Sequence, residues 1–204
     1  MRHVLVLTPQ DALRCLRAAR RVRPQLRPGA AMEVIEAEVL RGLHAFSGSE
    51  LCDALQSFVR LKAQEPELLQ SLGEAFSIQR NSMAPKQLSS ALMSLARLQL
   101  REGPLFNEVV PEIVRDIVGY SHRDLSLCLW AMAKAQQKDL RLAHRVQQLY
   151  CEGQNSRSLQ PMDVSMLLWS FSRLQWHAHP ELLGRLLGCA VKHTLYDLCR
   201  HLFD

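Results

Sequence analysis

Hydrophobic residues recur along the chain with the spacing of an amphipathic helix. The clearest segment runs from Asp124 to Lys134, with apolar side chains at Leu125, Cys128, Leu129 and Met132. Side chains at positions i, i+3, i+4 and i+7 share one face of a helix. The pattern therefore predicts a helix that buries this face and exposes the opposite one.

The same pattern occurs five times. Counted from the first apolar residue of each copy, the origins are Ala12, Leu51, Leu88, Leu125 and Val164, which are 39, 37, 37 and 39 residues apart. A fixed period of this length is typical of helical-repeat proteins. Capping residues or an early proline precede each origin and predict a helix start there. The units therefore start near residues 8, 47, 84, 121 and 160, with a partial sixth from 194.

A second amphipathic segment follows the first in each repeat, after a short break. Pro111 lies within the third of these segments, where it should kink or restart the helix. A pair of helices cannot bury its apolar faces alone, so neighbouring repeats must stack. The sequence predicts an all-α fold, an alpha-solenoid of about five helix-turn-helix repeats of ~38 residues that forms a single array over residues 1–204. The apolar stripes of the second helices are Met32, Ile35, Val39 and Leu43; Leu69, Leu72 and Phe76; Phe106, Val109, Ile113 and Ile117; and Leu183, Leu186 and Ala190.

Positive charge is concentrated at the start of the chain. The net charge is +5, but residues 1–32 contain seven arginines and one acid, whereas residues 33–204 contain 18 basic and 19 acidic side chains. An arginine-rich, acid-poor start is also typical of organellar transit peptides. Because residues 8–11 match the later helix starts, we interpret this segment as the first helix of the array. No apolar run approaches the ~18 residues of a membrane span.

A basic residue stands nine positions after the origin in every repeat: Arg21, Arg60, Arg97, Lys134 and Arg173. Stacked repeats would align these side chains into a track along one surface, which would suit the backbone of single-stranded RNA. The alternative is that each cation only stabilises the C-terminal end of its helix. In the first repeat, a strip suited to phosphate is formed by Arg14, Arg17 and Arg21, with Arg20 and Arg23 nearby.

Two repeats carry a tryptophan five positions after the origin, Trp130 and Trp169. Helical-repeat proteins can read one base per repeat with two or three side chains. In these two repeats, however, the residues at offsets 2, 5 and 6 are largely apolar. We therefore expect both tryptophans to pack between repeats and expect RNA contacts to be mainly to the backbone.

The chain shows no recognisable catalytic, cofactor or metal motif. Cys189, His193, Asp197 and His201 are four residues apart, which spreads them over too many helical turns to bind one ion. The six cysteines form no Cys-x-x-Cys pair, and Cys15, Cys52 and Cys128 fall at core positions of the repeat. They are interpreted as reduced core residues, which favours an intracellular or organellar compartment. The sequence thus predicts no enzyme, no cofactor and no metal.

The motif Asp-Leu-Ser-x-x-Leu-Trp-Ala-x-Ala-Lys at Asp124–Lys134, with its near copy at Asp163–Arg173, resembles the octotricopeptide repeat and the similar repeats of FAST-kinase-like and RAP-domain proteins. The resemblance extends over residues 8–204 and is clearest in the last three repeats. Those families are mainly organellar RNA-binding proteins. The resemblance implies a non-enzymatic, mitochondrial (alternatively plastid) RNA-binding protein. We favour a structural component of a mitochondrial ribosome or other ribonucleoprotein, in contact with rRNA and neighbouring proteins. A protein–protein scaffold and an organellar mRNA stability or processing factor remain alternatives.

Overall fold

The computed structural model describes residues 7–21, 30–62, 65–100, 104–137, 139–152, 159–189 and 191. All regular secondary structure in these residues is helical, so the predicted all-α fold class is confirmed. The chain forms two compact units, Met1–Leu105 and Phe106–Asp204. Within the described residues, no helix is long and apolar enough to cross a lipid bilayer.

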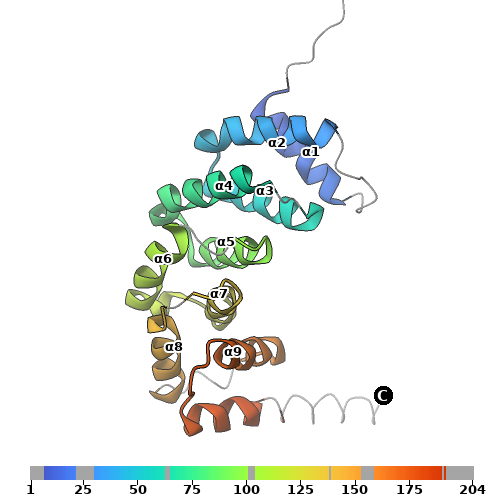
Figure 1. Cartoon of the computed structure of the whole chain (residues 1–204). Coiled ribbons are helices and arrows are strands. Elements are labelled where there is room, and N and C mark those ends of the chain that lie inside the picture. The colour runs from blue at the N-terminus through green and yellow to red at the C-terminus, as the bar shows by residue number, and fades with distance from the viewer. Residues whose placement is uncertain are drawn as a thin grey trace, which may run out of the picture. The chain divides into compact units, whose positions relative to one another are not determined.

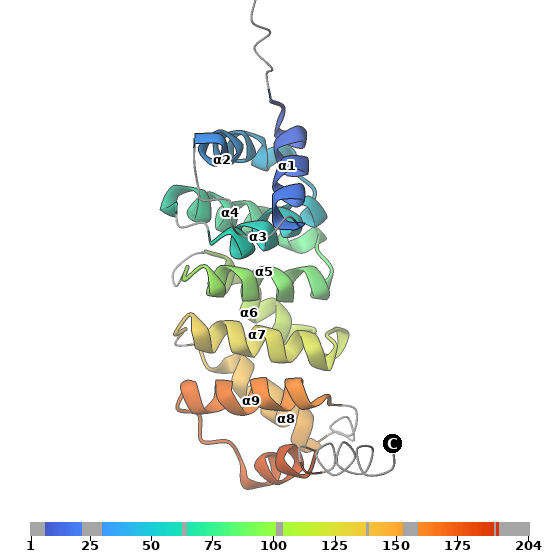
Figure 2. The same ribbon diagram turned by 90° about the vertical axis from the view of Figure 1, so that its right-hand side faces the viewer.

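The described part of the first unit is built from two layers of helices (Figures 1 and 2). In one layer, α3 (Gly48–Leu61) packs against both α1 (Pro9–Arg21) and α5 (Pro85–Arg97). In the other layer, α2 (Ala30–Gly42) contacts α4 (Pro66–Gln79). The short 3₁₀ turns η1 (Leu43–Ala45) and η2 (Arg80–Ser82) follow α2 and α4. The first helices of successive repeats therefore lie side by side.

In the second unit, α7 (His122–Lys134) packs along α9 (Pro161–Arg173), and α8 (Arg141–Glu152) contacts α7. A further helix covers 180–189. α6 (Pro104–Arg115) begins two residues before the unit boundary and is followed by the 3₁₀ turn η3 (Ile117–Gly119). α6 contains Pro111 and continues past it, so the helix does not restart there. Pro111 is exposed, and its ring therefore displaces no core side chain.

The first helix of each repeat begins two residues before the predicted acid or glutamine, as expected. The helix starts are Pro9, Gly48, Pro85, His122 and Pro161. Side chains of the predicted cap residues bind the free backbone N–H groups of the first turn. In α3, the Glu50 carboxylate accepts from the backbone N–H of Ser47 at 2.9 Å, and the Ser47 hydroxyl accepts from the Glu50 N–H. These local bonds explain why the starts could be predicted.

Four of these helices end on a residue with left-handed backbone conformation, namely Lys62, Gln99, Gln136 and Gln175. All four stand eleven positions after the origin of their repeat. After α5, the N–H of Leu100 donates to the carbonyl of Leu95 at 3.1 Å, and equivalent bonds close α7 and α9. This is the Schellman arrangement, which glycine usually allows. The helix ends were not predicted, because glutamine takes the place of glycine in three repeats.

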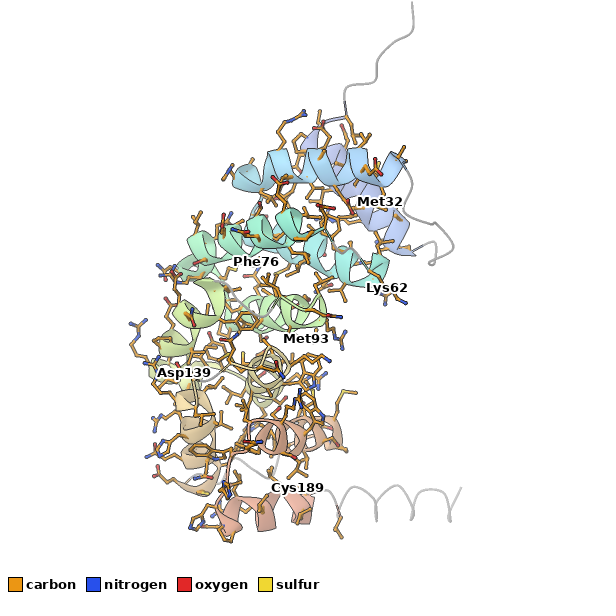
Figure 3. All side chains as sticks on the ribbon, in the orientation of Figure 1. Met32, Lys62, Phe76, Met93, Asp139 and Cys189 are labelled. Carbon is orange, nitrogen blue, oxygen red and sulfur yellow. The ribbon has the colours of Figure 1, made fainter. Side chains whose placement is uncertain are left out.

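The predicted apolar faces form the core. The residues 0, 3, 4 and 7 positions after the origin are all buried in α3, α5 and α7. Phe76 of α4, which belongs to the predicted stripe of a second helix, is fully buried as well (Figure 3). Three predictions were wrong. Cys15 is exposed, and Leu168 is only half-buried. In helix 180–189, Leu182 is buried together with the predicted Leu186, whereas the predicted Leu183 is exposed. In each case the periodicity located the helix face, but the neighbouring elements do not cover that position.

Candidate functional site

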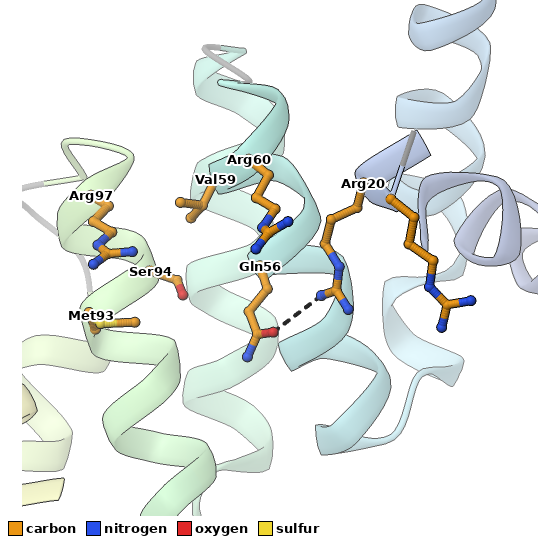
Figure 4. A pocket seen from close by; sticks show the side chains of 8 residues that line it. Arg20, Gln56, Val59, Arg60, Met93, Ser94 and Arg97 are labelled. Carbon is orange, nitrogen blue, oxygen red and sulfur yellow. Dashed lines mark hydrogen bonds between the residues drawn. The ribbon is translucent and has the colours of Figure 1, made fainter. Parts of the chain in front are cut away.

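Three helices of the first unit contribute arginine side chains to one pocket of about 480 Å³. Arg20 and Arg21 belong to the last turn of α1, Arg60 to the last turn of α3, and Arg97 to the last turn of α5. The other lining residues are Gln56, Val59, Met93 and Ser94 (Figure 4). The lining thus holds four guanidinium groups and no carboxylate, a composition that favours an anionic ligand.

The repeat explains why these arginines meet. Arg21, Arg60 and Arg97 hold the same position, nine residues after the origin, on three consecutive first helices. Because α3 packs against both α1 and α5, equivalent positions of the three helices lie near one another. Figure 4 shows Arg60 and Arg97 on neighbouring helices, on the same side of the layer as Arg20. Three of the five basic residues predicted to form a track therefore line a single pocket.

Hydrogen bonds fix one wall of the pocket. The Arg20 guanidinium donates to the side-chain oxygen of Gln56 at 3.2 Å, and the Gln56 amide donates to the Ser90 hydroxyl at 3.1 Å. This chain of bonds links α1, α3 and α5. By contrast, Arg21 and Arg60 are exposed and form no ion pair with any residue that the structure describes. Their guanidinium groups can bind a ligand without first breaking a salt bridge.

The predicted basic strip of the first repeat is partly neutralised. Arg14 lies 3.1 Å from the Asp11 carboxylate, and Arg17 lies 2.8 Å from the Asp53 carboxylate of α3. Neither arginine lines the pocket. The Nε of Arg17 is buried and has no hydrogen-bond partner among the described residues. Arg23 lies outside the described residues. Of the strip, Arg20 and Arg21 are the members that reach the pocket.

The other two basic residues of the predicted track, Lys134 and Arg173, are exposed in the last turns of α7 and α9 in the second unit. Each follows a tryptophan by four residues. The Trp130 and Trp169 rings lie 5.8 Å apart, with their planes inclined by 31°. The two tryptophans therefore pack against each other between repeats, as expected, but Trp130 is half-buried whereas Trp169 remains 41% exposed. The neighbouring helix covers only part of its indole.

In α3 and α9, the residue six positions after the origin is not available to read nucleobases. Ser57 and Ser170 are fully buried. Their hydroxyls donate to the backbone carbonyls of Asp53 and Met166, at 2.7 and 2.6 Å. A serine bonded to the preceding turn of its own helix satisfies its polar group locally. This placement agrees with the expectation that RNA contacts are mainly to the backbone.

The cysteines divide between core and surface. Cys52 and Cys128 are buried as predicted, and burial raises the pKa of the Cys52 thiol to about 11. Of the four residues weighed as a metal site, His193, Asp197 and His201 lie outside the described residues. A different cluster brings together Cys151, His179 and Glu181.

The Cys151 cluster is a poor metal site. Arg185 lies 2.7 Å from the Glu181 carboxylate, which it already neutralises. A guanidinium group this close to a ligand carboxylate opposes a divalent cation.

No protein-family model matches the sequence, and no curated protein matches it significantly. The resemblance to octotricopeptide repeats thus remains an expectation drawn from the two motif copies. Among the described residues, the arginine pocket is the candidate site for the function of the chain.

Proposed function

We propose that this protein is a non-enzymatic RNA-binding protein that holds the backbone of single-stranded RNA in the pocket lined by Arg20, Arg21, Arg60 and Arg97. The single observation that carries the proposal is the convergence of four guanidinium groups from three helices. Guanidinium groups bind phosphate oxygens through paired hydrogen bonds. A pocket of about 480 Å³ exceeds what one phosphate needs. It falls within the range that accommodates small organic ligands, and one nucleotide would fit.

The fold proposed for the whole chain is an alpha-solenoid. Its support is the common phase of the five helix starts, together with the side-by-side packing of α1, α3 and α5 in one unit and of α7 and α9 in the other. In such an array, a basic residue at the same position of each repeat recurs along one surface. Lys134 and Arg173 of the second unit hold the same repeat position as Arg60 and Arg97, and we propose that they contact phosphate in the same way.

The cellular setting proposed is the mitochondrion, as a structural component of a mitochondrial ribosome or another ribonucleoprotein. The supports are the resemblance of the two motif copies and the guanidinium lining of the pocket, which suits phosphate. A protein that recognises phosphate and shape suits a structural role, because such contacts position RNA without selecting its sequence. Isolation of the native complex, with sequencing of its RNA, tests this setting.

Charge-matched variants test RNA binding. One variant combines Arg60→Gln with Arg97→Gln, and its control combines Arg41→Gln with Arg115→Gln, which are exposed on the second helices α2 and α6. Fluorescence anisotropy measures the affinity of each for a labelled single-stranded RNA of about 16 nucleotides at several salt concentrations. Both variants lose two positive charges, so a general charge effect is the same for both.

The pocket variant should bind RNA more weakly than the control. Its slope of log affinity against log salt should shrink by about 0.7 for each lost phosphate contact, or roughly 1.4 in all. Preference among RNA sequences should not change. If both variants bind equally well, or the wild-type protein does not bind RNA, the basic residues at the helix ends serve only to stabilise their helices. A protein–protein scaffold then becomes the better interpretation.

A further inference from the structure

The second unit carries an aromatic pair that the phosphate track does not explain. Trp130 on α7 and Trp169 on α9 hold the same position of successive repeats. Their ring centroids are 5.8 Å apart, in the range of offset aromatic pairs. Tryptophan stabilises a fold mainly through the large apolar area that it buries. An indole that is 41% exposed gives up part of that contribution, and its free surface is available to a ligand.

A cation accompanies each of these rings. Lys134 follows Trp130 by four residues, and Arg173 follows Trp169 by four, so each pair shares a helix face. Both cations are exposed. α7 and α9 pack side by side, and each of the two helices carries one indole and one cation. Nucleic-acid strands present the complementary series, in which flat bases alternate with negative phosphates.

We propose that Trp169, whose ring packs against that of Trp130, is a stacking platform for an unpaired RNA base, and that Lys134 and Arg173 hold the adjoining phosphates. This inference rests on the proposed RNA-binding function and adds a contact to the base. Stacking needs a base that has left a duplex, so the platform selects single-stranded over double-stranded RNA. It does not select a base, because every base has an aromatic face.

The neighbouring side chains are consistent with a platform open on one side. Met162 lies seven residues before Trp169, on the same face of α9, and is exposed. Arg123 of α7 is held by the buried Asp163 at 3.0 Å and lies 3.5 Å from the Met166 sulfur. These contacts join α7 to α9 through residues that precede Trp130 and Trp169 in the two helices. The spacing between the two rings is therefore set by the fold, and the platform is formed before RNA binds.

The test compares Trp169→Ala and Trp169→Phe with the control Val118→Ala, which shortens another exposed apolar side chain of the second unit. Each protein is titrated with single-stranded RNA, with an abasic strand of the same length and with a blunt RNA duplex. Circular dichroism checks that each variant is folded. Trp169→Ala should weaken binding to single-stranded RNA by roughly 5- to 150-fold, the range measured for loss of one stacked base.

The pattern of losses identifies stacking. Trp169→Ala should leave the affinity for the abasic strand and the salt slope unchanged, since no phosphate contact is lost. Trp169→Phe should recover part of the affinity because it retains an aromatic face. In a Trp176→Phe background, where Trp130 and Trp169 are the remaining tryptophans, RNA should quench the intrinsic fluorescence. This last measurement needs no change to the platform itself.

Three outcomes would overturn the inference. If wild-type protein binds single-stranded RNA and Trp169→Ala binds it equally well without fluorescence quenching, Trp169 does not stack on a base, and the arginine pocket stands by itself. If Trp169→Ala converts a wild-type dimer to a monomer in sedimentation, the platform packs against a second copy of the chain. If wild-type protein binds no RNA, the proposed function fails as well.

Discussion

Two acids that hold the same repeat position should differ in their contribution to stability. Glu50 of α3 and Asp163 of α9 both stand at the third position of a first helix. Glu50 is half-exposed, and its hydrogen bonds are those of the capping box with Ser47 and one with the Gln10 side chain of α1. Asp163 is buried. The position was predicted from sequence as a helix cap in both repeats, but Asp163 joins its helix to the neighbouring one through two buried or partly buried contacts, with Arg123 and Ser126.

The contacts of Asp163 allow an estimate. Its Oδ2 accepts from the N–H of Gln160 at 3.3 Å, a cap bond whose loss costs about 1 kcal/mol. Its Oδ1 accepts from Arg123 of α7 at 3.0 Å, and the arginine is half-exposed, so this pair adds less than about 1 kcal/mol. Oδ1 also accepts from the buried Ser126 hydroxyl at 3.2 Å, which contributes about 0.5–1 kcal/mol. The sum is about 2 kcal/mol.

Asp163→Ala should therefore lower the free energy of unfolding by about 2 kcal/mol, whereas Glu50→Ala should lower it by about 1 kcal/mol or less. Urea unfolding followed by circular dichroism measures both losses. Amide hydrogen exchange assigns each loss to its helices, because Asp163→Ala should speed exchange in α7 as well as α9. Equal losses for the two variants, or unchanged exchange in α7, would refute the view that Asp163 links the repeats.

Three further predictions concern packing and pH. Leu129→Ala should cost about 2–5 kcal/mol in urea unfolding, because Leu129 is buried in α7, and an unchanged midpoint would place it outside the core. Gly42→Ala should lower the melting temperature, since the added methyl would lie 2.9 Å from Cγ of the rigid Pro9 ring. The control Gly184→Ala has open space and should be neutral or stabilising; equal effects would contradict the predicted clash. Burial lowers the pKa of His122 below 6.5, so the unfolded chain binds more protons as pH falls below 6.5. Stability should therefore drop through that window, and a His122→Asn variant with the same pH slope would show that another group is responsible.

Much of the fold could be predicted from local pattern. Helix starts depend on bonds within one turn, as between Ser47 and Glu50, and helix faces depend on spacing within one helix. Both are properties of short segments, which is why five helices begin where the sequence predicted. The left-handed helix ends at Gln99, Gln136 and Gln175 were missed, although the same residue type recurs at the same repeat position. That recurrence was a signal available in the sequence.

The candidate site was only partly predictable. The basic residue nine positions after the origin of each repeat could be recognised in the sequence. The sequence could not show which arginines would pair with a carboxylate. Arg17 pairs with Asp53, a residue 36 positions away, whereas Arg60 finds no carboxylate among the described residues. Such pairings depend on how one helix is set against the next. Arg20 lies 3.9 Å from the same Asp53 carboxylate, and it lines the pocket together with Arg21, Arg60 and Arg97.

The sequence by itself determined where the helices of this protein lie and which face of each is apolar, because both follow from residues within a few turns of one another. Tertiary structure alone decided how far each face is covered. Cys15 stands at a position that the repeat pattern marks as core, yet it is exposed, and Trp169 packs against Trp130 of the neighbouring repeat, yet 41% of its surface is exposed. Burial requires a neighbouring element on that side, and periodicity within one helix carries no information about the extent of its neighbour.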